Sequence, residues 1–114
     1  MKICIYGAGA IGSLVGSELT RGGHQVTLIG RGAHLAAIKA NGLTIRMNGE
    51  ERLTRPACTE DAAEAGVQDL VIFVLKAHQV AVAAENIAPL LGPTTPVVAA
   101  LTEIWRRLEI KAAA

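Results

Sequence analysis

Residues 2–23 read KICIYGAGAIGSLVGSELTRGG. The first five residues are typical of a strand that is covered on both faces, and they lead into three glycines with the spacing G-x-G-x-x-G. Apolar residues then recur at helical spacing until Gly22 and Gly23 end the pattern. A strand, a glycine turn and a helix in this order predict that a dinucleotide pyrophosphate binds at the helix N-terminus. The alternative is a turn of the same shape that binds nothing.

The three glycines have separate expected roles. Gly7 makes the tight turn, Gly9 lets the backbone approach the pyrophosphate, and Gly12 lets the helix pack closely on the strand. The pyrophosphate is expected to meet the free N–H groups and the partial positive charge of the helix N-terminus.

Composition indicates a packed globular chain with a local site. The 114 residues are 51% apolar, 18% charged and only 3% aromatic, so we expect one domain with an aliphatic core. A net charge of +1 favours neither nucleic acid nor an anionic membrane as a partner. No apolar run is long enough to span a bilayer. Cys4 and Cys58 have no metal-ligand spacing, so no metal site is expected and a reducing, cytoplasmic setting fits best.

The rest of the chain alternates predicted strands and helices. Leu70 to Leu75 are apolar without alternation, as in a central parallel strand, and Asn48-Gly49 is typical of a hairpin turn at a sheet edge. The other expected elements are a strand at 25–29, helices at 33–40 and 80–91, a short acidic turn at 59–65 and a last strand at 96–100. This order predicts an α/β fold of Rossmann type, a doubly wound and mostly parallel sheet in a single domain over residues 1–114.

In such a sheet the ligand lies outside the carboxyl ends of the strands. That rule selects three segments: the turn at 7–12, the turn at 30–32 and residues 76–79. Dinucleotide-binding folds that prefer NAD carry an acidic residue after the second strand, and this chain has Arg31 there. A guanidinium holds a 2′-phosphate through charge-assisted bonds, so the predicted cofactor is NADPH. The alternative is that Arg31 is a solvated loop residue.

Lys76 and Gln79 follow the central strand, and this position alone places them at the cofactor edge. The segment from Asp69 to Gln79, DLVIFVLKAHQ, together with residues 1–12 and the run GHxVTLIGRG, resembles the cofactor half of the ketopantoate reductase family, whose members are 2-dehydropantoate 2-reductases. The resemblance covers about the first hundred residues. It implies an NADPH-dependent oxidoreductase of pantothenate biosynthesis. It also implies that the three glycines hold the pyrophosphate, that Arg31 holds the 2′-phosphate, and that Lys76 and Gln79 contact the cofactor near its reactive end. The expected cofactor-binding residues are Gly7, Ala8, Gly9, Ala10, Ile11, Gly12, Arg31, Lys76 and Gln79.

The chain departs from the family in two places. Thr102-Glu103 stand where the family has an Asn-Gly pair, and the helical catalytic domain that the family would carry has no counterpart in these 114 residues. Catalytic residues are therefore not assigned. Residues 101–111 instead have one apolar helical face. This helix either packs on its own sheet, which we favour, or forms a homodimer contact.

Three functions stay open at this level. The first is an NADPH-binding domain of the ketopantoate reductase type that binds cofactor with little or no turnover alone. The second is a stand-alone nucleotide-sensing module, and the third is a truncated fragment that binds no nucleotide. Cofactor titration separates them.

Overall fold

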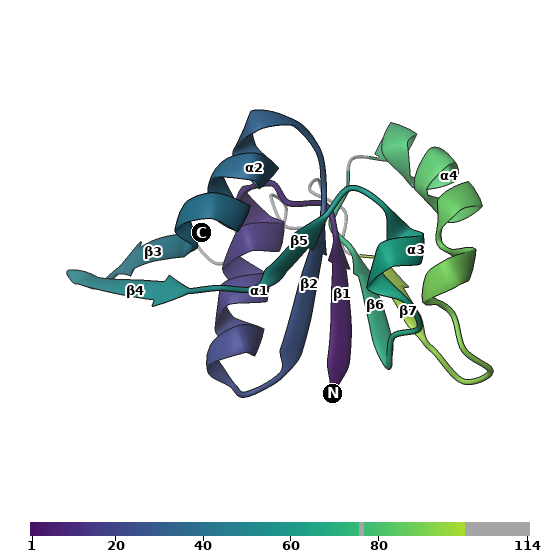
Figure 1. Ribbon diagram of the computed structural model, residues 1–114, viewed down its shortest axis with the longest axis horizontal. Helices are drawn as coiled ribbons and strands as arrows, with labels where there is room; N and C mark the ends of the chain where they lie inside the picture. The colour runs from purple at the N-terminus through teal and green to yellow at the C-terminus, as the bar shows by residue number, and fades with distance from the viewer. Residues whose placement is uncertain (76, 100–114) are drawn as a thin grey trace, which may run out of the picture.

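The computed structural model describes residues 1–75 and 77–99 (Figure 1). In chain order the elements are β1 (Lys2–Tyr6), α1 (Ala10–Arg21), β2 (Gln25–Ile29), α2 (Gly32–Asn41), β3 (Leu43–Met47), β4 (Glu50–Thr54), β5 (Ala57–Thr59), α3 (Ala62–Ala65), β6 (Leu70–Phe73), α4 (Ala77–Asn86), the 3-10 helix η1 (Ala88–Leu90) and β7 (Val97–Ala99). The helix expected at 101–111, and with it the alternative of a dimer contact, lies outside the described residues.

The strands β5, β2, β1, β6 and β7 form one sheet in that order, and every neighbouring pair is parallel. The first strand therefore lies in the middle, with the chain winding outward on both sides of it (Figure 1). This arrangement confirms the predicted α/β, doubly wound sheet. Because all five strands point the same way, their carboxyl ends meet at one edge.

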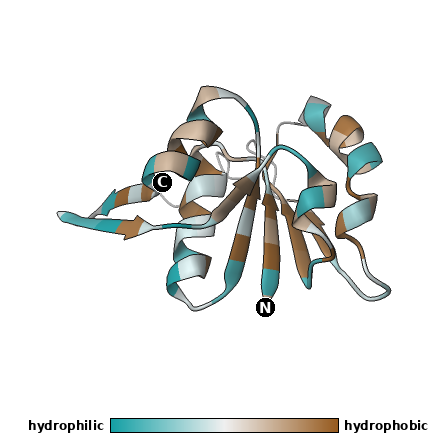
Figure 2. Ribbon diagram, in the orientation of Figure 1, coloured by the Kyte–Doolittle hydropathy of each residue, from teal (hydrophilic) through white to brown (hydrophobic). Residues whose placement is uncertain are grey.

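Both faces of the sheet are covered, which explains why its central strands are apolar without alternation. On one face, Ile5 and Leu28 pack with the side chains of α1 and α2. On the other face, Cys4 and Val71 pack with α3, α4 and η1. Figure 2 shows the hydrophobic positions concentrated on the central strands and hydrophilic ones at the hairpin tip. The core is aliphatic as predicted, with one edge-to-face aromatic pair between Tyr6 and Phe73.

Helix α1 lies close to the sheet because its buried face is made of small residues. Its buried positions are Gly12, Ser13, Gly16 and Ser17. The larger apolar residues Ile11, Val15 and Leu19, which recur at helical spacing, are only partly buried at the margin of the core. A close approach of helix and strand needs small side chains between them, so the tertiary contact reverses the order of burial that hydrophobicity alone predicts.

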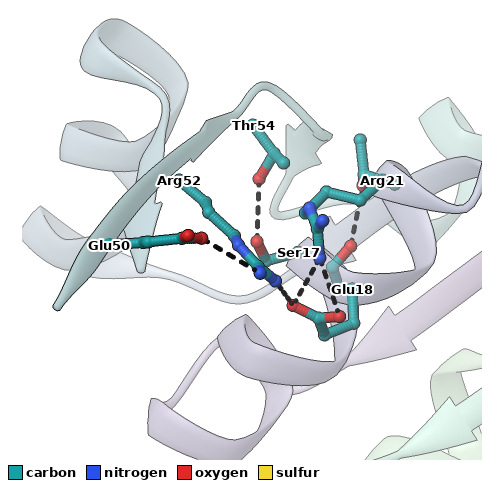
Figure 3. Close-up of polar contacts among 8 residues, drawn as sticks. Ser17, Glu18, Arg21, Glu50, Arg52 and Thr54 are labelled. Carbon is teal, nitrogen blue, oxygen red and sulfur yellow. Dashed lines mark hydrogen bonds and ion pairs between the residues drawn. The ribbon is translucent and has the colours of Figure 1, made fainter. Parts of the chain in front are cut away.

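The predicted hairpin around Asn48-Gly49 is present. Strands β3 and β4 form a separate two-stranded sheet instead of an edge of the main sheet. Figure 3 shows how it is attached to α1: Thr54 donates its hydroxyl to Ser17 Oγ at 3.2 Å, and Arg52 forms ion pairs with Glu18 and Glu50. The Thr54–Ser17 pair is buried, so the inner side of the hairpin is fixed by a polar contact within the core margin.

Other boundaries differ from the sequence prediction, and helix α4 begins at Ala77 where the predicted helix began at residue 80. Residues 57–59 form β5, an edge strand that pairs with β2, where no strand was predicted and only Thr59 belonged to the expected acidic turn at 59–65. The central strand β6 ends at Phe73, two residues before the end of its apolar run. Helix α4 ends at Asn86 and is followed by η1, because Pro89 has no N–H for a helical hydrogen bond.

Because Cys4 is buried, the free energy of unfolding is expected to change with pH in the alkaline range. Burial raises the pKa of the Cys4 thiol from its usual 9.0 to about 12. The folded state therefore keeps a proton that the unfolded state loses above pH 9.0. This contribution to stability is complete below that pH and is lost as the pH rises toward 12, at about 1.4 kcal/mol per pH unit. Urea unfolding of the wild type and of Cys4→Ala between pH 8 and pH 11 should show a shallower pH slope for the variant. Equal slopes would contradict the assignment.

Candidate functional site

The glycine turn joins the end of β1 to the start of α1 and is held by backbone hydrogen bonds. Gly7 has a φ of +125° and donates its N–H to the carbonyl of Ile29 at 2.8 Å. The buried hydroxyl of Ser13 donates to the carbonyl of Ala8 at 3.2 Å, and the N–H of Ser13 bonds the carbonyl of Gly9 at 2.8 Å. These bonds tie the turn both to β2 and to the first turn of α1, so its shape is set by the protein itself.

The protein requires glycine at two of the three motif positions. A Cβ on Gly7 would overlap the carbonyl oxygen of Val74, and a Cβ on Gly12 would overlap the carbonyl oxygen of Gly7. Gly9 differs from both, since a Cβ there would meet no described atom within 4 Å and its φ of −74° suits any residue. The reason for glycine at position 9 is therefore not found in the packing of the described residues.

The N-terminus of α1 is open for an anion. Gly9 is its N-cap residue, and no side chain caps it. The N–H groups of the first helical turn, from Ala10 to Gly12, have no acceptor within the helix itself. With the partial positive charge of the helix end, these donors suit a phosphate group.

A groove of about 870 Å³ runs along the carboxyl ends of β1, β2 and β6. It brings together residues of the glycine turn, the end of β2, the start of α2, the residue after β5, the end of the β6 segment and one side of α4. Its lining is Tyr6, Gly7, Ala8, Gly9, Ile29, Gly30, Arg31, His34, Glu60, Val74, Leu75, Gln79, Val82, Ala83 and Asn86. The topological rule applied to the sequence predicted this edge of the sheet.

The predicted site residues divide into three groups. Gly7, Ala8, Gly9, Arg31 and Gln79 line the groove. Ala10, Ile11 and Gly12 lie in the first turn of α1, where they contribute backbone and, for Gly12, close packing. Lys76 lies outside the described residues. The structure thus brings segments 70 residues apart to one groove, while the role of each residue toward a cofactor stays a prediction.

Arg31 follows the carboxyl end of β2 and is the N-cap residue of α2. Its side chain is exposed. Within residues 1–75 and 77–99, no hydrogen bond or ion pair engages its guanidinium. The positive charge of Arg31 nevertheless acts on Tyr6, which lines the groove. Burial and the neighbouring Cys4 raise the pKa of the Tyr6 hydroxyl, and the Arg31 guanidinium acts against that rise. Arg31 is therefore a cation in the groove lining whose guanidinium has no hydrogen-bond or ion-pair partner among the described residues.

Sequence reasoning missed Glu60, the acidic residue of this groove. It follows β5 directly, and Oε1 of its carboxylate accepts the backbone N–H of Gly32 at 3.2 Å. Glu60 lines the same groove as Arg31. The signal that would have found it is the strand before it, which is only three residues long and was not predicted. His34, Val82 and Asn86, also in the lining, were not predicted either.

Residues 1–75 and 77–99 form neither a metal centre nor a membrane span. No group of three or more His, Cys, Asp or Glu side chains there is placed to hold a metal ion. Every helix in the same ranges is too short or too polar to cross a bilayer.

Residues 3–101 match the family model described as ketopantoate reductase PanE/ApbA. The chain belongs to this family. Over 99 residues it is 46% identical to the 2-dehydropantoate 2-reductase of Mesorhizobium japonicum, a match that covers 86% of this chain and 30% of that protein. The chain thus spans about a third of the length of its relatives.

Solved structures of a ketopantoate reductase and of another dehydrogenase share the fold. A PanE/ApbA family ketopantoate reductase from Ralstonia eutropha JMP134 superposes with a TM-score of 0.81 at 34% identity, covering 89% of this chain and 34% of that one. A D-mandelate dehydrogenase solved with NADH and anilino(oxo)acetate superposes with a TM-score of 0.79 at 37% identity, covering 89% of this chain and 33% of that one. The expected family resemblance is confirmed over the described sheet.

Proposed function

We propose that this chain is the NADPH-binding domain of a ketopantoate reductase-like oxidoreductase. The observation that carries the proposal is Gly9. It stands at an uncapped helix N-terminus in an 870 Å³ groove, and the described packing does not require it to be glycine. A ligand whose phosphates approach the backbone at this point gives that glycine a reason.

The residues present fit a dinucleotide whose pyrophosphate lies at the glycine turn and whose adenosine ribose lies near Arg31. The pyrophosphate would lie against the backbone of Gly7 to Gly12, where the first-turn N–H groups of α1 supply the donors. Arg31 would hold the 2′-phosphate through charge-assisted hydrogen bonds, since it lines the same groove and its guanidinium has no partner among residues 1–75 and 77–99. Gln79 and Lys76 are proposed to contact the cofactor, Gln79 from the α4 side of the groove.

The nicotinamide cofactor, when bound, supplies the hydride. The residues of this chain bind and orient it and exclude water from one side through the apolar wall of Val74, Leu75 and Val82. The substrate, by its likeness to the 2-dehydropantoate 2-reductases, is proposed to be 2-dehydropantoate or a related 2-oxo acid. Because the chain spans about a third of such relatives, we propose that these 114 residues alone bind cofactor with little or no turnover. The two free cysteines support a reducing, cytoplasmic setting.

Replacing Arg31 by alanine tests the assignment of the 2′-phosphate. Loss of a charge-assisted contact of about 1.5–3 kcal/mol is expected to weaken NADPH binding by about tenfold to 100-fold. Binding of NADH, which has no 2′-phosphate, should change by less than about threefold. Calorimetric titration of the wild type and of Arg31→Ala with NADPH and with NADH measures this difference. Arg55→Ala is the matched control, because Arg55 is exposed and outside the groove lining.

The outcomes are separable. Equal weakening for both cofactors would mean that Arg31 does not contact the 2′-phosphate. A wild type that prefers NADH would favour a nucleotide-sensing module, and one that binds neither cofactor would favour a non-binding fragment. The D-mandelate dehydrogenase solved with NADH shows that NADH has to be included as a competitor.

A further inference from the structure

Glu60 lies where a carboxylate works against the proposed cofactor. It lines the groove together with Arg31, and its Oε1 accepts the N–H of Gly32, the residue directly after Arg31. Two segments 28 residues apart are joined there because β5 pairs with β2, with Ile29 opposite Thr59. The carboxylate therefore lies beside the Arg31 backbone at the end of the groove where the guanidinium is exposed.

The contact of Glu60 with Gly32 also occupies the start of α2. Arg31 is the N-cap residue of this ten-residue helix, and its side chain makes no capping bond. The Glu60 carboxylate takes that place and accepts the N–H of the first helical residue. Negative charge is favourable at a helix N-terminus, so this carboxylate stabilises α2 from a neighbouring strand.

We propose that Glu60 opposes Arg31 at the ribose 2′ position and so limits the preference of the site for a 2′-phosphorylated cofactor. This inference rests on the proposed function. A 2′-phosphate carries up to two negative charges and is repelled by a carboxylate at the same end of the groove. A free 2′-hydroxyl is uncharged and can donate a hydrogen bond to that carboxylate. Glu60 thus penalises NADPH and tolerates NADH, whereas Arg31 does the reverse.

The test is the variant Glu60→Gln. The amide oxygen of glutamine still accepts the N–H of Gly32, so the variant removes the charge and keeps the contact. Removing one negative charge from this end of the groove is expected to strengthen NADPH binding by about fivefold at low salt, and the gain should shrink as salt rises. NADH binding should change by less than about twofold. The control is Glu51→Gln, which makes the same change of net charge on β4, outside the groove lining.

Titration of wild type and both variants with NADPH, NADH and the fragment 2′,5′-ADP gives distinct outcomes. A selective gain for NADPH and 2′,5′-ADP in Glu60→Gln supports the inference. An unchanged ratio of NADPH to NADH affinity, in a variant whose thermal unfolding matches the wild type, would overturn it and leave the proposed function standing. A wild type that binds neither cofactor would overturn both. If Glu60→Gln is destabilised, Glu60→Ala in the same titrations supplies the second measurement of the ratio.

Discussion

Alanine in place of Gly9 is expected to weaken NADPH binding by about 30-fold while changing the free energy of unfolding by less than about 1 kcal/mol. The methyl group would enter space that no described protein atom occupies, and the φ of −74° suits alanine. The substitution is therefore expected to leave the free energy of unfolding nearly unchanged. The pyrophosphate, in contrast, would lose its close approach to the backbone, and overpacking of this kind costs about 2 kcal/mol.

Urea denaturation and calorimetric titration of the same preparation separate the two effects. Gly22→Ala is a suitable control, because Gly22 has a negative φ, its Cβ would meet no atom closer than 3.4 Å, and it lies at the far end of α1 from the groove. Undiminished NADPH affinity in Gly9→Ala would show that the phosphates do not lie against this turn.

Alanine in place of Gly12 is expected to have the opposite result, a loss of about 3 kcal/mol or more in the free energy of unfolding. Its Cβ would overlap the carbonyl oxygen of Gly7, a backbone atom that cannot rotate away. Gly7 is itself held by its bond to Ile29, so relief would require α1 to move off the sheet. Such a loss is a large part of the stability of a domain of this size.

The midpoint of urea unfolding should fall while the slope with urea stays constant, since the same surface is exposed on unfolding. Gly22→Ala again serves as the control. A loss below about 1 kcal/mol in Gly12→Ala would show that α1 and the turn are less closely packed than the structure has them.

The two substitutions together assign different causes to glycines of one motif. Gly7 and Gly12 are accounted for by contacts inside the protein, and Gly9 by the proposed ligand. A turn of the same shape that binds nothing would need the first two only. The pair of variants thus distinguishes the cofactor-binding interpretation from the purely structural one.

The sequence by itself determined most of the order of elements, though not β5, and the edge of the sheet where the candidate site lies. Strand, glycine turn and helix are local patterns, since they depend on residues two to four positions apart, and β1, α1, β2 and the β3–β4 hairpin appear where those patterns place them. The rule that ligands lie at the carboxyl ends of parallel strands then selected the groove edge with Gly9, Arg31 and Gln79.

Only the tertiary structure decided which side chains meet across that groove. β5 is three residues long and carries no pattern of its own, yet its pairing with β2 brings Glu60 to the N-terminus of α2 beside Arg31. The distinction between Gly9 and Gly12 likewise depends on the distance of α1 from β1, which small buried residues permit. Pairing and close packing join residues distant in the chain, and their energies depend on neighbours that no local window contains.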